Sequence, residues 1–519
     1  MTIFTPQETN RMSGEIHNAQ RIVRNTLMLY IRMFVLLLVG LYTSRVVLNA
    51  LGENDFGVYN VVGGVVSMFT VISGALTAAV TRFITFEMGK GDPERLRKVY
   101  STAVSIQLAL AAVIVILAEP AGLWFIDNRM TIDPSRIPAA RWVLQFSLLT
   151  FVINLMTVPQ MAVITAHEKM SAYAGIGLLD GFLRLGTALL ITCSSSDRLI
   201  IYSALMAAGV LIVRAAYGIY CRIHFADIRY KAGFDPKLMR EMASFAGWNF
   251  IGVTSGVLRD HGGNILVNLF FGTAVNAARG MAVQLNGAVQ GFVTNFMTAV
   301  NPQITKSYAS GDTSYMLSLV MKASRMSFYL LFVIALPILL NTDYLLGIWL
   351  KEVPAHTSGF AQLFLVFALS ESLSHPLITA QLATGNIRRY QLTVGGLQLL
   401  NIPVSYIFLK AGAAPEVTVA VAIALSQICL AARLILLRGM VGLEVGVFLR
   451  KVYLNVIAVA SAALVVPLLL GGFMPSGFAG FLCSVILSVA SAGLSVLFIG
   501  FSREERRTFR SMISRRMAG

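Results

Sequence analysis

The sequence predicts an all-α polytopic membrane protein with about 14 transmembrane helices. Three observations predict this fold class. The 519 residues are 56% hydrophobic and only 13% charged, which is far from the composition of a soluble domain. Apolar runs long enough to cross a bilayer recur along the whole chain, and one span needs roughly 20 mostly apolar residues. Landmarks from the first half of the chain also recur in the second half.

The apolar runs place the spans as follows. The first run comes after a polar segment at residues 1–24 and is too long for a signal peptide, so it is predicted as a span. The predicted spans are 25–51, 56–88, 97–118, 139–166, 171–192, 199–222, 243–271, 274–302, 322–341, 358–384, 391–409, 416–437, 453–472 and 477–500.

Two similar strings indicate that the first twelve spans are a duplicated set of six. ITFEMGKGD at 84–92 resembles ITKSYASGD at 304–312, and both close the second span of a set. Further recurring pairs are Phe56-Gly57 with Phe271-Gly272, and Pro159 and Tyr173 with Pro376 and Tyr390. Because each set has an even number of spans, the two lobes are predicted to be parallel repeats, an arrangement that transporters use.

The duplication and the charge pattern divide the chain into six segments. These are a cytoplasmic N-terminal segment (1–24), a six-helix lobe (25–222), a cytoplasmic linker (223–242), a second six-helix lobe (243–438), two further transmembrane helices (439–500) and a basic cytoplasmic tail (501–519). Most of the 41 Lys and Arg residues fall in the loops numbered as inside, so both termini are predicted to be cytoplasmic. The net charge of +16 therefore reflects orientation, and no nucleic-acid partner is expected.

Arginines within the spans are the main functional signal. A charged side chain at the bilayer centre costs about 2.5–3.5 kcal/mol even on the most lenient scale, so such residues predict a functional site. They are Arg32, Arg45, Arg82, Arg184, Arg214, Arg259, Arg279 and Arg433. Acidic residues in spans are fewer, namely Asp180, Asp260 and Glu371. A cavity with more arginines than acidic residues would attract phosphate or carboxylate cargo. An exporter of cationic drugs would be expected to have more acidic residues than arginines.

Ordinary structural roles compete with this interpretation. Arg82, Arg214 and Arg433 lie near span ends, where long side chains reach the interface. Arg259 is adjacent to Asp260, so a structural ion pair is the alternative there. On the eighth span a polar stripe falls within an arc of roughly 80° and favours a hydrated cavity wall suited to sugar hydroxyl groups. Its members are Asn276, Arg279, Asn286, Gln290, Thr294 and Asn301.

No catalytic motif is recognisable in the sequence. The chain lacks a P-loop, HExxH and GxSxG, and its four cysteines lack metal-ligand spacing, so neither an enzyme nor a metal site is expected. Transport coupled to a proton or sodium gradient would use Asp180, Asp260 or Glu371. The enzymatic alternative is a multispan polyprenyl-phosphate glycosyltransferase using the carboxylates of Glu53-Asn54-Asp55, although those enzymes usually set such a pair in a long loop.

The chain resembles the bacterial polysaccharide-biosynthesis (O-antigen-type) flippases of the MATE-like (MOP) exporter superfamily. The resemblance covers essentially the whole length and rests on the six-six-two plan, on LGENDFGVY at 51–59 and on TRF at 81–83 through Gly91-Asp92. It implies transport of an undecaprenyl-diphosphate-linked oligosaccharide from the cytoplasmic to the periplasmic leaflet of the inner membrane. Alternating access would use a cationic cavity chiefly between spans 1, 2, 7 and 8. The predicted substrate-binding residues are Arg32, Arg45, Arg82, Arg259, Arg279, Asn286, Gln290 and Asn301.

Partners and alternatives follow from this resemblance. The expected partners are membrane lipid and the lipid-linked glycan, with the polysaccharide polymerase machinery as a further candidate. The first alternative is a MATE-type ion-coupled antiporter of drugs or other small molecules. The second is a flippase for the peptidoglycan lipid precursor, which resembles this chain in plan.

Overall fold

The fold is entirely helical in the part of the chain that the structure describes. The computed structural model describes residues 6–67, 69–130, 132–194, 196–225, 228–231, 235–350, 352–473, 475, 477–503, 505 and 506, and no strand occurs among them. In these ranges, twelve helices are long and apolar enough to cross a membrane, and a bent pair, α10 (Thr357–Ser372) with α11 (His375–Thr384), makes a thirteenth. The predicted all-α membrane fold is confirmed.

Helix α7 (Pro236–Ala309) accounts for one further predicted span. Its 74 residues would extend for about 110 Å, far more than the ~30 Å core of a bilayer. The helix is broken at Gly272, where φ is 79° and ψ is −171°. Arg279, beyond this break, hydrogen-bonds Asp260 and Asn264 before it. The two halves of α7 therefore fold back on each other and supply the seventh and eighth predicted spans.

Helix α1 (Pro6–Ser67) carries the same break at the equivalent place in the first repeat. Gly52 has φ 76° and ψ 168°, which is close to the conformation of Gly272. This region of backbone space is essentially restricted to glycine, because a Cβ atom would clash there. The sequence predicted span ends at both positions, and the shared backbone geometry supplies the physical reason for them.

The two recurring strings form the same turn. Gly91 ends α2 (Thr70–Lys90) with φ 73°, and the Asp92 side chain then caps α3 (Pro93–Asn128) by accepting from the Arg95 amide at 3.0 Å. In the second copy, Gly311 has φ 83° and the Asp312 side chain accepts from the Tyr315 amide at 3.0 Å. Glycine supplies the positive φ and aspartate satisfies an unpaired amide, so the recurring Gly-Asp pair has a structural role.

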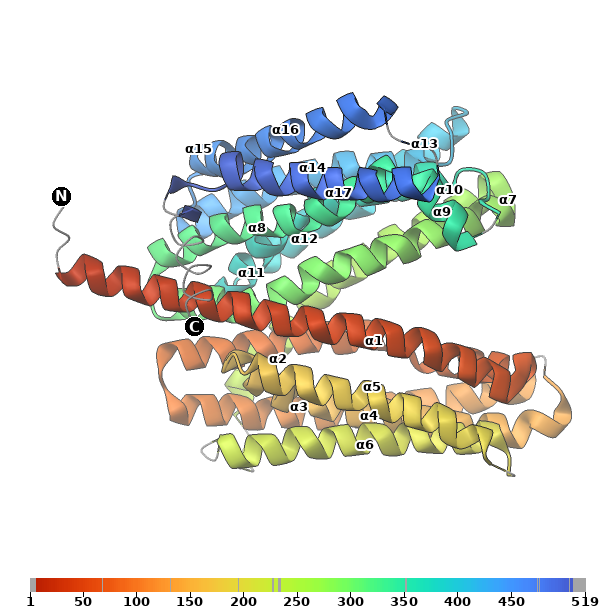
Figure 1. Cartoon of the computed structure of the whole chain (residues 1–519). Coiled ribbons are helices and arrows are strands. Elements are labelled where there is room, and N and C mark those ends of the chain that lie inside the picture. The colour runs from red at the N-terminus through yellow and green to blue at the C-terminus, as the bar shows by residue number, and fades with distance from the viewer. Residues whose placement is uncertain are drawn as a thin grey trace. The chain divides into compact units, whose positions relative to one another are not determined.

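The helices group into two compact units, one of which spans Leu27–Val253 and is called the first unit. In it, α4 packs against α2, α3 and α6, and α5 packs against α6 (Figure 1). Besides α2, α3 and the Leu27–Ser67 part of α1, its helices are α4 (Ile137–Ala166), α5 (Met170–Thr192), α6 (Arg198–His224) and the start of α7.

The second unit comprises Met1–Thr26 and Thr254–Gly519. Apart from the rest of α7 and the pair α10 and α11, its helices are α8 (Thr313–Leu340), α9 (Thr342–Leu350), α12 (Arg388–Leu399), α13 (Asn401–Lys410), α14 (Val417–Val441), α15 (Val445–Phe448), α16 (Leu454–Leu470) and α17 (Phe478–Ser495). The last two pack against each other and against α8 (Figure 1).

Of the predicted terminal segments, residues 1–5, 504 and 507–519 lie outside the described part.

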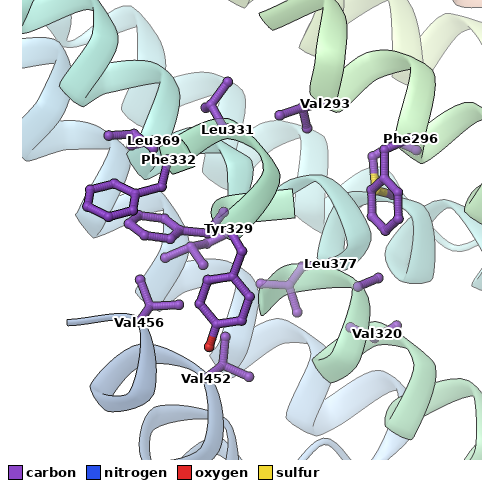
Figure 2. Packing of buried hydrophobic residues seen from close by; sticks show 14 of the residues in the cluster. Val293, Phe296, Val320, Tyr329, Leu331, Phe332, Leu369, Leu377, Val452 and Val456 are labelled. Carbon is purple, nitrogen blue, oxygen red and sulfur yellow. The ribbon is translucent and has the colours of Figure 1, made fainter. Parts of the chain in front are cut away.

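A large apolar cluster holds the second unit together. Figure 2 shows Phe296 from α7, Phe332 from α8, Leu369 from α10, Leu377 from α11 and Val456 from α16 in this cluster. In a bilayer the lipid tails are as apolar as these side chains, so close packing rather than exclusion of water stabilises the contact. The two C-terminal helices therefore belong to the core of this unit.

Replacing Gly272 with alanine tests the role of the break in α7. We expect Gly272→Ala to destabilise the protein by about 1–3 kcal/mol, because alanine is strained in this conformation. Gly280→Ala is the control, since Gly280 lies in the same helix, has no positive φ and leaves open space where an added Cβ atom would lie. Thermal unfolding in detergent measures both variants, and equal stabilities would contradict the assignment of a strained break.

Candidate functional site

All three acidic residues predicted within spans contact an arginine. On α5, Arg184 Nε lies 3.1 Å from Asp180 Oδ2. On α7, Arg259 Nε lies 2.9 Å from Asp260 Oδ1. These acids are therefore compensated in this state, so ion coupling through them would require an arginine to be released.

Glu371 on α10 is the third of these acids. Its Oε1 atom lies 3.8 Å from Arg433 Nη1, and that nitrogen also donates to Ser374 Oγ at 2.9 Å. The Arg433 side chain is only 1% exposed, so it does not extend to the membrane interface as its position near a span end had suggested. Arg433 is thus a structural partner of Glu371 inside the second unit.

Arg259 combines its ion pair with an aromatic contact. Its guanidinium group lies 4.9 Å from the centroid of the Phe367 ring on α10. The Arg259 side chain is 14% exposed whereas that of Asp260 is 63% exposed. The structural ion pair considered from the sequence is therefore present, and it leaves the carboxylate accessible.

Arg279 is held without a carboxylate partner. It donates from Nη1 to Asn264 Oδ1 and from Nη2 to the Asp260 carbonyl oxygen at 3.3 Å. Its guanidinium group also lies 5.3 Å from the centroid of the Phe364 ring. Among the described residues, its Nε atom has no hydrogen-bond partner and no carboxylate lies within ion-pair distance. Arg279, which is only 4% exposed, therefore has no ion-pair partner in the described part of the chain, and it lies together with the predicted site residue Arg259 because both contact Asp260.

Arg32 on α1 occupies a similar environment in the first unit. Its guanidinium group lies 4.6 Å from the centroid of the Tyr173 ring on α5 and directly against Gly177. Within the described ranges its Nε atom has no hydrogen-bond partner. A cation over an aromatic face is stabilised by the ring quadrupole without losing its charge.

The other two predicted arginines of the first unit differ from Arg32. Arg45 is exposed. Arg82 lies over the rings of Phe83, Phe86 and Phe245, at 4.7, 4.3 and 5.8 Å from their centroids. Aromatic faces thus surround the Arg82 guanidinium group on several sides.

The polar stripe of the eighth span is only partly free for a ligand. Asn301 Oδ1 accepts a hydrogen bond from Thr379 Oγ1 at 2.8 Å, so this end of the stripe contacts α11. The Oδ1 atom of Asn286 is buried and has no partner among the described residues, and Gln290 is half-buried. The Oδ1 atom of Asn276 is buried and without a partner among the described residues in the same way, so Asn276, Asn286 and Gln290 are the amides of the stripe that remain suited to a polar ligand.

A second charge cluster lies in the loops of the first unit. Arg136 donates from Nε to Asp55 at 2.8 Å and from Nη1 to Asp197 at 2.7 Å. Burial alone would raise the pKa of Asp197. However, the hydrogen bonds from Arg136 and from the Ile200 amide outweigh it and hold that pKa below its ordinary value. Two cavities of about 980 and 390 Å³ are both lined by Asp55 and Arg136.

Sequence reasoning missed several members of these clusters. Arg136 was not singled out from the other loop charges, and Asp55 was considered only as part of an acidic pair, whereas Arg136 joins Asp55 to Asp197. The side chain of Glu53, the other acid of that pair, lies outside the described residues. Asn264 and Gly177 also went unnoticed, because nothing local in the sequence shows what a residue on another helix will contact.

Comparisons with known proteins identify the fold. The MatE family model matches residues 29–180. An uncharacterized membrane protein of Bacillus subtilis (strain 168), EpsK, is 19% identical over 294 residues, which cover 56% of this chain and 58% of EpsK. The alignment therefore spans less than two thirds of the length of that relative.

Solved structures of MATE proteins match over more of the chain. A MATE mutant matches with a TM-score of 0.71 and 12% identity, covering 82% of this chain and 97% of that one. An outward-facing multidrug resistance MATE family transporter of the MOP superfamily matches with a TM-score of 0.70 and 13% identity. The match covers 82% of this chain and 96% of that one. A MOP superfamily transporter from Pyrococcus furiosus, described with a binding pocket of reverse polarity, matches at 0.68 and 13% over the same shares. The chain has the fold of the MATE transporters.

The lowered pKa of Asp197 predicts that the stability of the protein depends on pH. A group whose pKa is lowered by folding stabilises the protein above its unfolded pKa, and that contribution is lost as the pH falls through the folded pKa. We expect Asp197→Asn to lower the free energy of unfolding at pH 7 by about 1–3 kcal/mol. The difference from the native protein should shrink below about pH 4.

Thermal unfolding in detergent between neutral and acidic pH measures this difference. Asp127→Asn is the control, because the Asp127–Arg141 pair, at 2.9 Å, is more exposed and is expected to contribute about 0–1 kcal/mol. A difference between Asp197→Asn and the native protein that stays constant down to the lowest pH would refute the assignment.

Proposed function

We propose that the chain is a flippase that moves an undecaprenyl-diphosphate-linked oligosaccharide from the cytoplasmic to the periplasmic leaflet of a bacterial inner membrane by alternating access. The observation that carries the proposal is the pairing pattern of the arginines within the spans. Arg184, Arg259 and Arg433 have carboxylate partners, whereas Arg32 and Arg279 are held by aromatic rings, glycine backbone and an amide. The second group keeps its positive charge for a ligand.

A diphosphate is the cargo group that fits these arginines best. Guanidinium offers parallel N–H donors that match two oxygens of a phosphate group, and each such charge-assisted hydrogen bond is stronger than a neutral one. In a low-dielectric region an uncompensated arginine is expensive unless an anion binds it. Binding of the diphosphate would therefore be favoured at sites where arginine is already held.

Uncharged polar groups on the same helix as Arg279 suit the glycan. Asn286 has a buried oxygen without a partner among the described residues, and Thr294 on the same helix is exposed. Amide and hydroxyl groups both donate and accept hydrogen bonds, as sugar hydroxyl groups do. The lipid tail would remain in the bilayer, so membrane lipid is a necessary partner. The polysaccharide polymerase machinery is proposed as the recipient of the product.

The comparisons support transport but favour two cargo classes equally. The shared fold fits a MATE-type ion-coupled antiporter as well as a flippase, and one of the similar structures is described as a multidrug resistance transporter. Glu371 favours the antiporter, because a carboxylate within a span, 3.8 Å from its arginine partner, could exchange a proton or sodium ion. The excess of arginine favours an anionic cargo. A peptidoglycan lipid precursor would fit the same arginines, since it also carries a diphosphate.

The glycosyltransferase alternative loses support from the geometry of Asp55. Its carboxylate receives two hydrogen bonds from Arg136. A carboxylate engaged in this way by a guanidinium group is a poor general base and a poor metal ligand, because its oxygen lone pairs already accept hydrogen bonds. Asp55 instead stabilises the outer loops of the first unit.

Flux of a labelled undecaprenyl-diphosphate-linked glycan in proteoliposomes tests the proposal. We expect Arg279→Ala to reduce flux about tenfold or more, because a charge-assisted contact to the diphosphate is lost. Arg279→Lys should retain part of the activity, since it keeps the charge but not the planar donor pair. Arg259→Ala should also reduce flux, because the Asp260 carboxylate loses its ion-pair partner and can then neutralise Arg279, which donates to the Asp260 carbonyl oxygen.

Two outcomes separate the candidate functions. Unchanged flux in both Arg259→Ala and Arg279→Ala would remove the proposed site. Export of a cationic drug that depends on an ion gradient, with no flux of the lipid-linked glycan by the native chain, would replace the flippase with the antiporter.

A further inference from the structure

We propose that Gly177 and Gly263 are positioning residues, which seat the guanidinium groups of Arg32 and Arg279 so that each can bind a phosphate group. The inference rests on the proposed function and adds to it. It assigns a role to two glycines that carry no chemistry themselves. Each glycine leaves a flat surface of backbone on which the arginine side chain lies. We call this glycine, together with the aromatic ring that contacts the same guanidinium group, the seat of the arginine.

The seat in the first unit is formed by two residues of α5. A Cβ atom at Gly177 would lie 2.4 Å from Arg32 Nε and 2.7 Å from its Cζ, far inside contact distance. Tyr173 is one helical turn earlier on the same face of α5, and its ring centroid lies 4.6 Å from the Arg32 guanidinium carbon. The guanidinium group is therefore fixed by backbone on one side and an aromatic ring on another.

The seat in the second unit has the same components from different helices. A Cβ atom at Gly263 would lie 2.7 Å from Arg279 Nη2 and 3.3 Å from its Cζ. Phe364 on α10 supplies the aromatic contact at 5.3 Å, and Asn264 accepts a hydrogen bond from Arg279 Nη1. In both units, then, glycine and an aromatic ring hold an arginine that has no carboxylate partner among the described residues.

Such a seat orients a guanidinium group without neutralising it. A carboxylate partner, as for Arg433, also fixes the side chain but uses the donors that a phosphate would need. Arg32, Arg279 and Arg433 each have a buried Nε atom without a partner among the described residues, but of the three only Arg433 lies against a carboxylate. Because bidentate binding requires a defined plane and no competing carboxylate, Arg32 and Arg279 are prepared for an anion in a way that Arg433 is not.

Other glycines on the same helices serve ordinary packing, which provides matched controls. A Cβ atom at Gly181 would lie 2.3 Å from Leu36 Cδ2, and one at Gly262 would lie 2.6 Å from Ile402 Cδ1. Alanine at these positions therefore meets an aliphatic side chain at about the same closeness as alanine at Gly177 or Gly263 meets a guanidinium group. In all four cases the atoms that must shift belong to flexible side chains, so the helices themselves need not move.

Binding of undecaprenyl diphosphate to the full chain in detergent tests the inference. We expect Gly177→Ala and Gly263→Ala each to raise the Kd about tenfold, because a displaced guanidinium group loses a charge-assisted contact. Gly181→Ala and Gly262→Ala should bind like the native chain. A thermal melt of all four variants checks that they are folded.

Double substitutions separate positioning from packing. In an Arg32→Ala background, adding Gly177→Ala should cause no further loss of binding, and the same holds for Gly263→Ala in an Arg279→Ala background. The inference is overturned if Gly177→Ala and Gly263→Ala bind like the native chain, or if the control variants lose as much affinity. It is also overturned if the glycine substitution weakens binding further when the arginine is already absent. Absence of diphosphate binding by the native chain would instead overturn the proposed function, and this inference with it.

Discussion

The cost of placing a charge in the bilayer interior is the constraint on which the rest of this structure depends. Five of the arginines within the spans are held in one of two ways. Arg184, Arg259 and Arg433 are paired with carboxylates, which cancels their charge locally. Arg32 and Arg279 are instead held by aromatic faces, backbone and amide oxygen, which stabilise the cation without cancelling it. The first group is neutralised within the fold, and we propose that the second group binds the ligand.

The duplicated architecture supplies the sites at which these arginines are held. Gly52 and Gly272 break α1 and α7 with the same backbone conformation, and Gly-Asp turns follow at Gly91 and Gly311. These positions recur because they have backbone requirements that few residues meet, whereas the surrounding apolar residues are interchangeable. The breaks bring the second half of α7 back along the first half, and this contact places Arg279 beside Asp260 and Asn264.

Much of the fold could be predicted from the sequence, because the length of an apolar segment and the glycine and aspartate residues of a turn are local properties. The Gly-Asp turns after α2 and α7 were visible as a recurring pair, and span ends were predicted near Gly52 and Gly272. The predicted register was wrong at the break, because it matched Gly272 with Gly57, whereas the shared backbone conformation matches Gly272 with Gly52. The partners of the charges could not be predicted in the same way. Arg433 looked like a residue that reaches the interface, yet it is buried against Glu371, which is distant in sequence. Only the Arg259–Asp260 pair, which is adjacent in the chain, was visible as an alternative beforehand. The roles of the glycines beneath Arg32 and Arg279 could not be predicted either, since glycine has no side chain whose chemistry would indicate its neighbours.

A structure of the full chain bound to undecaprenyl diphosphate tests the central claim most directly. The account predicts phosphate oxygens within about 3 Å of the guanidinium nitrogens of Arg32 or Arg279, with the Tyr173 and Phe364 contacts retained. The account is contradicted if the diphosphate binds elsewhere while both arginines keep their places, or if both arginines are found paired with carboxylates in the bound state.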